Sequence, residues 1–363
     1  MLETYSTQAI ALLSRLIAAP SLSREEEQTA GIIELFLKEQ GCATFRKGNN
    51  VWTQSIIDEQ LPVILLNSHH DTVKPAASWT RDPFAPVIEN GRLYGLGSND
   101  AGASLVSLMM TFLHFVKQKD RNFNLIYAAT AEEEIGGKNG IALILDELGA
   151  FDLAIVGEPT QMQMAVAEKG LMVLDCETVG KTGHSARNEG VNAIYLALED
   201  IEWFKNFKFP RSSSLLGDVK MTISVINAGY QHNIVPESCK YVVDVRTNEY
   251  YKNTDALAII RENMKHSAVT PRSTNVNSSS IPIEHPFVQV GLSLGLTAFG
   301  SPTTSDQARI QYPSIKIGPG NSARSHTANE YIELDEIHSG IDIYIQLLNG
   351  YMSQWLPYIC NDS

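Results

Sequence analysis

The chain alternates short apolar runs with longer segments in which apolar residues recur every three or four positions. The short runs are residues 61–68, 124–131, 153–158 and 314–320, and each ends in polar residues or glycine. Helical spacing is found in residues 6–18, 29–41, 101–118 and 139–148. Apolar strands that alternate with helices are typical of a mainly parallel sheet covered on both faces. We therefore predict an α/β domain of this kind.

The second of these helices carries a start signal in its sequence. Ser23 is followed three residues later by Glu26, which is the spacing of a capping box. Gly41 stands where the helix would end.

Residues 170–282 have a different pattern. Their apolar runs alternate with polar residues, as half-buried antiparallel strands do, and two helical stretches lie among them at 192–207 and 253–267. The pattern predicts a small α+β domain inserted into the α/β domain. The α/β domain would then consist of residues 1–169 and 283–363, with the insertion at 170–282.

Composition limits the partners and the compartment. The 363 residues carry a net charge of -13, which argues against nucleic acid or an anionic membrane as a partner. Four scattered cysteines form no CxxC pair, which fits a reducing compartment and predicts a cytoplasmic protein. The N-terminal segment lacks the basic start of a signal peptide. No apolar run approaches the roughly 20 residues that a membrane-spanning helix needs.

Chemically active residues follow each predicted strand. They are His69, His70 and Asp71 after the first, Glu132, Glu133 and Glu134 after the second, Glu158 after the third, and Ser325 and His326 after the fourth, with Asp100 in a further turn. In an open parallel sheet, ligands bind outside the carboxyl ends of the strands. Imidazole and carboxylate without thiolate suit a catalytic metal site. The number of ligands fits two metals that share a carboxylate, with one further carboxylate free to act as a base.

The motifs resemble the M20 metallopeptidase family, of the acetylornithine deacetylase and succinyl-diaminopimelate desuccinylase type. They are "HHDTV" (69–73), "GRLYGLGSND" (91–100), "TAEEEIGG" (130–137), "GEPT" (157–160), "GKTGHSA" (180–186), "NIVPE" (233–237), "VDVRT" (243–247) and "SHTANEYI" (325–332). They occur in the family's order and span most of the chain. The resemblance implies two divalent metal ions, zinc in the first place and cobalt as an alternative.

The resemblance also implies a role for each motif residue. His69 and Glu158 would bind the first metal, Glu134 and His326 the second, and Asp100 would bridge them. Asp71 would orient His69, and Glu133 would be the general base. In the inserted domain, His184 would stabilise the oxyanion from across a homodimer interface, while Arg246 and Asn233 would contact the substrate.

Several positions remain open at this stage. Arg324 is either a surface charge or a second contact to a substrate carboxylate, and Asp306 either fixes a loop or supports the site. Glu132 is interpreted as a charged neighbour that supports its loop. The family often follows the bridging Asp with Met-Lys-Gly, whereas Asp100 is followed by Ala101-Gly102-Ala103, so this motif does not specify the subfamily or its substrate.

The predicted function is a two-metal amidohydrolase that removes an N-acyl group from an amino acid. The first hypothesis is the conversion of N-acetyl-L-ornithine to L-ornithine and acetate in arginine biosynthesis. The alternatives are an N-acetyl- or N-succinylcitrulline deacylase, an N-succinyl-diaminopimelate desuccinylase, and a dipeptidase or carboxypeptidase with the same metals. A non-catalytic binding protein is a hypothesis of another class, and it would be expected to have lost the base or a metal ligand.

Overall fold

The computed structural model describes residues 2–118 and 120–359, and these form two compact units. The first unit contains the chain up to Val166, together with Ser280–Phe299 and the part from Ser305 onward. The second unit contains Ala167–Ser279 and the short segment Gly300–Thr304. Each unit has its own apolar core, and each is described below by itself.

The first unit is built on a nine-stranded sheet with parallel strands at its centre. In spatial order these are β6 (Asn124–Thr130), β3 (Val63–His69), β7 (Leu153–Val156) and β15 (Ser314–Lys316). Beyond β6 lie β2 (Asn50–Ser55) and β1 (Thr44–Lys47), and beyond β15 lie β8 (Met164–Glu168), β13 (Ser279–Ser280) and β14 (Ala298–Ser301). β2 and β8 run antiparallel to their inner neighbours. The predicted α/β class is confirmed, with a mixed rather than uniformly parallel sheet.

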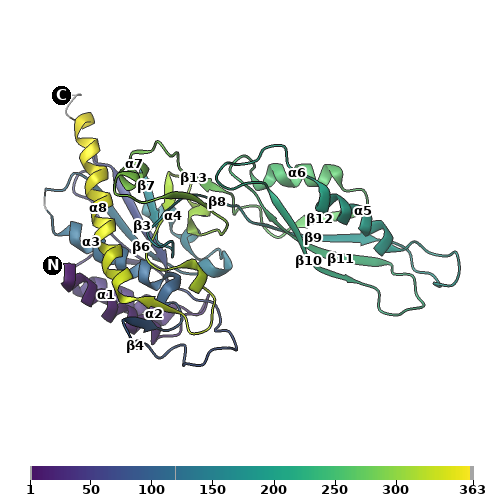
Figure 1. The fold of residues 1–363 in the computed structure, drawn as a ribbon, viewed down its shortest axis with the longest axis horizontal. Coiled ribbons are helices and arrows are strands. Elements are labelled where there is room, and N and C mark those ends of the chain that lie inside the picture. The colour runs from purple at the N-terminus through teal and green to yellow at the C-terminus, as the bar shows by residue number, and fades with distance from the viewer. Residues whose placement is uncertain (1, 119, 360–363) are drawn as a thin grey trace. The chain divides into compact units, whose positions relative to one another are not determined.

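Side chains of the central strands alternate between two apolar cores. On β3, Ile64 and Leu66 belong to the larger core, whereas Leu65 belongs to the smaller core on the opposite face. The larger core is covered by α1 (Leu2–Ile17), α2 (Glu27–Glu39), α3 (Ala103–Val116), α7 (Pro286–Ser293) and α8 (Leu334–Ile359) (Figure 1). The smaller core is covered by short turns: η3 (Ile141–Leu143), α4 (Leu145–Leu148) and η4 (Asp306–Arg309). Helical segments therefore cover both faces, as predicted, but unequally.

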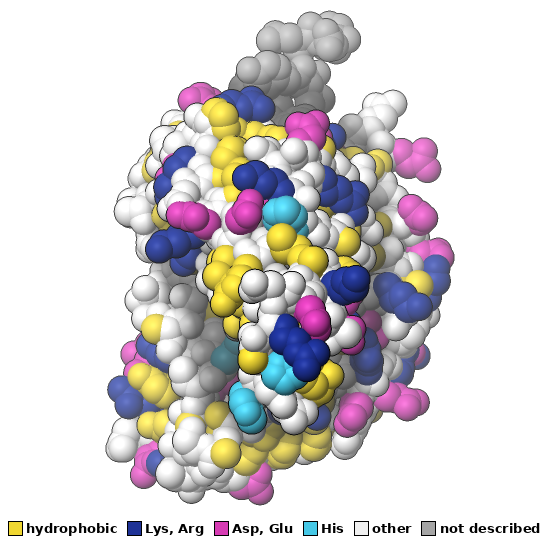
Figure 2. Space-filling model, turned by 90° about the vertical axis from the view of Figure 1, so that its right-hand side faces the viewer, with side chains coloured by type: hydrophobic (Ala, Val, Ile, Leu, Met, Phe, Trp, Pro, Cys, Tyr) yellow, Lys and Arg dark blue, Asp and Glu magenta, His cyan; other side chains and the backbone are white. Residues whose placement is uncertain are grey.

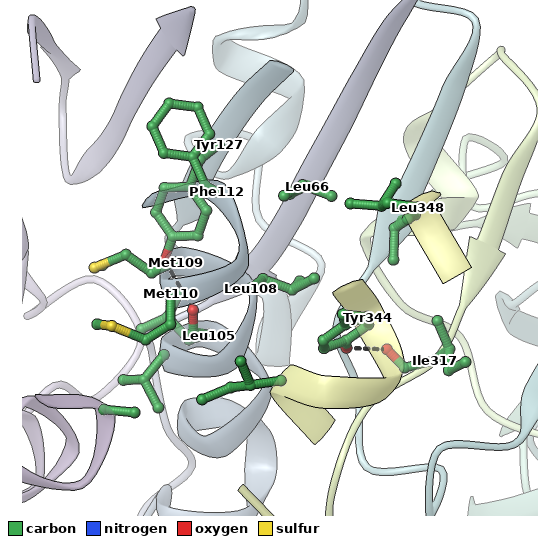
Figure 3. Packing of buried hydrophobic residues seen from close by; sticks show 14 of the residues in the cluster. Leu66, Leu105, Leu108, Met109, Met110, Phe112, Tyr127, Ile317, Tyr344 and Leu348 are labelled. Carbon is green, nitrogen blue, oxygen red and sulfur yellow. Dashed lines mark hydrogen bonds between the residues drawn. The ribbon is translucent and has the colours of Figure 1, made fainter. Parts of the chain in front are cut away.

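Helix α3 lies at the centre of the larger core. It contacts β3 and β6 on one side and α1 and α8 on the other. A helix buried on all sides is apolar all round, which accounts for the apolar residues of this segment. Across the core, the Tyr344 hydroxyl of α8 donates to the Ile317 carbonyl at 2.6 Å and satisfies a buried polar group (Figure 3).

The prediction of a continuous helix at 139–148 is wrong. The segment forms the 3₁₀ turn η3 and then the single α-helical turn α4, with Ile144 between them. Ile141, Ile144 and Leu148 all pack against the smaller core, so the spacing was helical although the helix is broken. A segment this short is held by packing more than by helix propensity.

A small sheet joins the middle of the chain to its C-terminal part. It consists of β4 (Val87–Glu89), β5 (Arg92–Tyr94) and β16 (Tyr331–Glu333), with β5 in the centre. After β5 the chain enters the turn η1 (Ser98–Gly102), which leads into α3. The sheet therefore brings the segment before β16 next to the turn that contains Asp100.

The second unit is an antiparallel sheet with two helices on one face. Its strands are, in spatial order, β10 (Lys220–Ala228), β11 (Ser238–Arg246), β9 (Met172–Val179) and β12 (Ser267–Pro271). The helices α5 (Ala193–Asn206) and α6 (Asn253–Asn263) close a separate core with buried residues such as Leu174 and Val243. Burial alternates along β9 and β11, in agreement with the predicted alternation. In the part of the chain that the structure describes, no helix is long and apolar enough to span a membrane.

Candidate metal centre

Three parallel strands end at the same edge of the sheet of the first unit. His69, the last residue of β3, lies opposite Thr130, the last residue of β6. Glu133 and Glu134 follow in the turn η2 (Glu133–Ile135), and Glu158 comes shortly after β7. The edge where a ligand was expected therefore holds residues from three separate strand ends.

His69 lies among several carboxylates. Its Nε2 atom is 3.4 Å from Asp100 Oδ1, 3.7 Å from Glu158 Oε1 and 3.9 Å from Glu133 Oε2. The imidazole is 1% exposed, and its Nε2 has no hydrogen-bond partner among the described residues. Buried polar atoms normally have a partner, so this nitrogen is placed as a ligand atom would be.

His326 approaches the same carboxylates from the C-terminal part of the chain. Its Nε2 lies 2.9 Å from Glu134 Oε2 and 3.6 Å from Asp100 Oδ2. Asp100 thus presents one carboxylate oxygen to each histidine, which is the arrangement of a bridging ligand. We call His69, Asp100, Glu133, Glu134, Glu158 and His326 the carboxylate–histidine cluster.

The cluster concentrates negative charge in a buried place. Burial, with Asp100 and Glu134 nearby, raises the pKa of Glu158 to about 8. Burial and neighbouring carboxylates also raise the pKa of Glu133. The pKa of His69 is raised despite its burial, because Asp100, Asp71, Glu133 and Glu158 favour its charged form. Burial and crowding thus disfavour negative charge at Glu133 and Glu158, while the surrounding carboxylates favour positive charge at His69.

The donor set fits divalent cations. Among the described residues, two groups of three side chains each bring their ligand atoms within 4.8 Å of one another. The groups are His69, Asp100 and Glu134, and His69, Glu133 and Glu158. Histidine and carboxylate donors are those of catalytic zinc, cobalt and manganese sites. The distances alone do not separate Glu133 from Glu134, so the distinction between base and ligand stays a prediction from the family resemblance.

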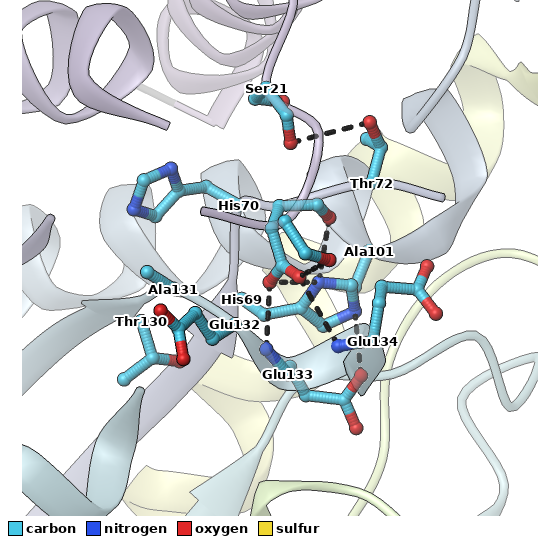
Figure 4. A network of polar contacts seen from close by, with 12 residues as sticks. Ser21, His69, His70, Thr72, Ala101, Thr130, Ala131, Glu132, Glu133 and Glu134 are labelled. Atoms are coloured by element: carbon cyan, nitrogen blue, oxygen red, sulfur yellow. Dashed lines mark hydrogen bonds and ion pairs between the residues drawn. The ribbon is translucent and has the colours of Figure 1, made fainter. Parts of the chain in front are cut away.

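Asp71 contacts both His69 and the turn that carries Glu133 and Glu134. His69, Glu133 and Glu134 lie close together in Figure 4. The Nδ1 atom of His69 lies 3.0 Å from the Asp71 carbonyl and 3.5 Å from its carboxylate. The same carboxylate accepts hydrogen bonds from the Glu133 and Glu134 amides at 2.9 and 3.2 Å. Although burial acts in the opposite direction, His69, the Ser23 hydroxyl and the Glu133 amide hold the pKa of Asp71 below its usual value. Asp71 therefore stays ionised and fixes both the histidine and the turn η2.

The predicted capping box is wrong. Helix α2 has no side-chain cap, and the Ser23 hydroxyl instead donates to Asp71 Oδ2 at 2.7 Å. The Glu26 carboxylate accepts from the amides of Arg24 and Glu132, at 2.6 and 3.3 Å. Ser23 and Glu26 therefore do not make the reciprocal hydrogen bonds of a capping box, because their side chains bind other residues.

Glu330 is a buried residue near the site that sequence reasoning missed. Its carboxylate accepts hydrogen bonds from the amides of Gly97, Asn99 and Asp100, and it is 2% exposed. Burial and the Asp100 charge raise the pKa of Glu330 to about 8, while the three amides act in the opposite direction. The only sequence signal was its place four residues after His326 in "SHTANEYI".

Other acidic and histidine neighbours have structural partners. His70 lies between the Thr29 hydroxyl and the Asn49 carbonyl, both at 2.9 Å. The carboxylate of Glu132 accepts two hydrogen bonds from Asn139 within its own loop. Asp306 accepts from Thr130 at 2.6 Å, and burial raises its pKa to about 6. These hydrogen bonds indicate a structural role for His70 and Glu132, and they place the Asp306 carboxylate next to the last residue of β6.

Arg324 is paired within the first unit. Its Nη1 lies 2.6 Å from Glu336 Oε2, and its guanidinium lies 4.5 Å from the centre of the Tyr331 ring. The predicted contact with a substrate carboxylate would have to share the guanidinium with Glu336. Its assignment to substrate binding stays a prediction.

The other predicted substrate residues belong to the second unit. His184 forms a β-bridge with Ile234, and its Nδ1 accepts from the Ala186 amide at 3.1 Å. Asn233 is adjacent, since its carbonyl accepts from the Ser185 amide, and its buried Oδ1 has no partner among the described residues. Arg246 makes a two-point contact with Asp244 at 2.8 and 3.0 Å. The structure thus brings His184 and Asn233 together.

Comparisons with known proteins agree on one family. The family model described as peptidase family M20/M25/M40 matches residues 65–350. The chain is 22% identical to succinyl-diaminopimelate desuccinylase 2 of Ruegeria sp. (strain TM1040), over 96% of both chains. It is 27% identical to acetylornithine deacetylase of Proteus mirabilis (strain HI4320), over 79% of both.

A solved structure supports the same fold. The YXEP protein of Bacillus subtilis, described as a dinuclear metal-binding peptidase of the M20 family, superimposes with a TM-score of 0.72 at 15% identity. The match covers 97% of this chain and 98% of that one. With the family model spanning most of the sequence, the chain belongs to the peptidase family M20/M25/M40, whose members are metal-dependent hydrolases of amide bonds.

Proposed function

We propose that this protein is a two-metal deacylase that converts N-acetyl-L-ornithine to L-ornithine and acetate. The observation that carries the proposal is the carboxylate–histidine cluster, in which Asp100 faces both His69 and His326. Relatives named acetylornithine deacetylase and succinyl-diaminopimelate desuccinylase both support an N-acylated amino acid as the substrate. Because one of these relatives is named a desuccinylase, removal of a succinyl group is the alternative reaction to be tested against removal of an acetyl group.

The cluster would hold two divalent cations, for which we propose zinc, with cobalt as a substitute. His69, Glu158 and Asp100 would hold one, and Asp100, Glu134 and His326 the other. The dinuclear description of the Bacillus subtilis relative supports this number. When bound, the two cations supply positive charge that polarises the acyl carbonyl and lowers the pKa of a water molecule.

Glu133 is proposed as the general base and acid. Its carboxylate, 3.9 Å from the His69 imidazole, takes a proton from the attacking water and passes it to the leaving nitrogen. Burial and the neighbouring carboxylates raise the pKa of Glu133 above its usual value, and a perturbed pKa is common in groups that transfer protons in active sites. Asp71 keeps the turn of Glu133 in place through the amide hydrogen bond.

The second unit is proposed to complete the site and to form a homodimer, so that it would act as the dimerisation domain. His184 of the partner subunit would stabilise the oxyanion, while Asn233 and Arg246 would contact the substrate. Strand β10 supports pairing between subunits, because it is an edge strand whose Val225 and Ile226 are 47% and 53% exposed. An edge of this kind can pair with its own copy about a two-fold axis.

The remaining partners and the compartment follow from charge and cysteine chemistry. On the face shown in Figure 2, acidic side chains are interspersed with the basic ones, and the net charge of the chain is -13. We therefore propose small N-acyl amino acids as partners, without nucleic acid or membrane. Cys42, Cys176 and Cys239 are free thiols, which supports a cytoplasmic location, and Cys360 lies outside the described residues.

A panel of substrates tests the proposal. Purified protein with bound metal should hydrolyse N-acetylornithine faster than N-acetylcitrulline, N-succinylcitrulline, N-succinyl-diaminopimelate or simple dipeptides, as measured by kcat/KM. Preference for a succinylated substrate would replace the deacetylase proposal with a desuccinylase. Bound metal without turnover of any member of the panel would favour a binding protein.

Replacing Glu133 separates the base from the ligands. Glu133→Gln should keep both metals and lose about 10² to 10⁴ in kcat, because general-base catalysis contributes this much. Metal content by elemental analysis and steady-state kinetics measure the two effects. Glu134→Gln is the matched variant and should lose metal. Metal loss from Glu133→Gln alone would mean that the two glutamates have exchanged roles.

Replacing Asp100 tests the bridge. An amide carries no charge and cannot serve two cations as a carboxylate does, so Asp100→Asn should lower the occupancy of both metal positions. Equilibrium dialysis followed by elemental analysis gives the occupancy at each free metal concentration. One metal bound with unchanged affinity would contradict the bridging role.

Mixed dimers test His184. His184→Ala should keep the metals and lose about 10² to 10³ in kcat, the usual effect of removing one oxyanion donor. Mixing His184→Ala with Glu133→Gln subunits should restore part of the activity, because one site of each mixed dimer would have both a base and a histidine. With subunit exchange verified, a lack of recovery would show that His184 does not act across an interface.

A further inference from the structure

We propose that Glu330 is a positioning residue that holds Asp100 in place for metal binding and joins it to the segment that carries His326. The inference rests on the proposed function, because it assigns Asp100 and His326 to the metal centre. It concerns a residue for which the sequence pattern and the comparisons give no role.

The contacts of Glu330 are directed at one loop. Its Oε1 accepts from the Asn99 and Asp100 amides at 2.8 and 2.9 Å, and its Oε2 accepts from the Gly97 amide at 3.1 Å. The side chain is 2% exposed, so water does not replace these bonds. A carboxylate is an acceptor at both oxygens, which suits three converging N–H donors.

The loop needs an external acceptor because it is not a regular helix. Gly97 has a φ of +75°, and Asp100 and Ala101 inside the turn have non-helical backbone angles. The amides of Asn99 and Asp100 lie at the start of this turn and donate to the Glu330 carboxylate. Buried amides without a partner are costly, so the Glu330 carboxylate stabilises the conformation that turns Asp100 toward the histidines.

The other side of Glu330 is equally fixed. It lies four residues after His326, and its carbonyl accepts from the Gly95 amide at 3.1 Å. The next residue, Tyr331, begins β16 and pairs with Tyr94 of β5. One residue thus connects the strand and loop that supply Asp100 with the segment that supplies His326. The two ligand side chains lie 3.6 Å apart.

The position predicts a graded effect of substitution. In Glu330→Gln, the side-chain carbonyl can still accept from Asn99 and Asp100, but the amide nitrogen then faces the Gly97 amide and loses one hydrogen bond. Glu330→Ala loses all three. Residues behind a metal ligand usually change metal affinity by about 10- to 100-fold. Because Asp100 is proposed to serve both cations, we therefore expect about tenfold weaker metal binding at both positions for Glu330→Gln and a larger loss for Glu330→Ala.

Titration of the metal-free protein with Co²⁺ tests the inference without measuring activity. Visible absorption and elemental analysis after dialysis give the affinity and the number of bound ions, and thermal unfolding of the metal-free variants reports stability. The matched control is Glu333→Gln in the same segment, which removes the negative charge of the pair between Glu333 and Arg92 and should bind Co²⁺ like the wild type.

The outcomes separate the inference from the proposed function. Wild-type protein that binds fewer than two Co²⁺ ions would contradict the proposed function. Two ions bound with equal affinity by the wild type, Glu330→Gln and Glu330→Ala would overturn the inference alone, even if both variants were less stable. If Glu330→Ala does not fold, the affinity of Glu330→Gln decides the question.

Discussion

Repulsion between buried carboxylates is the constraint on which the rest of this structure depends. Asp100, Glu133, Glu134 and Glu158 gather around His69 and His326. Burial and the neighbouring carboxylates raise the pKa values of Glu133 and Glu158, because an ionised carboxylate is costly in such a place. Two divalent cations would offset this cost, so bound metal would serve electrostatic balance as well as chemistry.

The acidic residues divide into two kinds by their hydrogen bonds. Asp71 and Glu330 accept backbone amides and thereby fix the loops around them. Among the described residues, the side chains of Glu133 and Glu158 accept no backbone amide and face His69 instead. The carboxylates of the first kind are thus held by backbone donors, whereas those of the second kind are available to a cation or a proton. Which members of the second kind act as ligands and which as base stays a prediction.

The sequence was sufficient to locate strands made of short apolar runs and the residues that follow the ends of these strands. Apolar runs located β3, β6 and β7, and parallel pairing then placed His69, Glu133 and Glu158 at one edge. Local rules failed where distant partners compete. Ser23 fits a capping box yet binds Asp71, and the support that Glu330 gives to the Asp100 loop depends on two segments that meet only in the folded protein. The partner of Arg324 could not be foreseen for the same reason.

The register of the central strands has a consequence for the tolerance of the chain to insertions and deletions. His69 stands level with Thr130 because β3 and β6 pair residue by residue along their whole length. Side chains alternate between faces, so removing one residue from the middle of β3 would exchange the sides of Leu65 and Leu66 or turn His69 away. A two-residue change would keep the faces but move the histidine by about 6.6 Å. The number of residues in this strand is therefore fixed, both as odd or even and in its actual value.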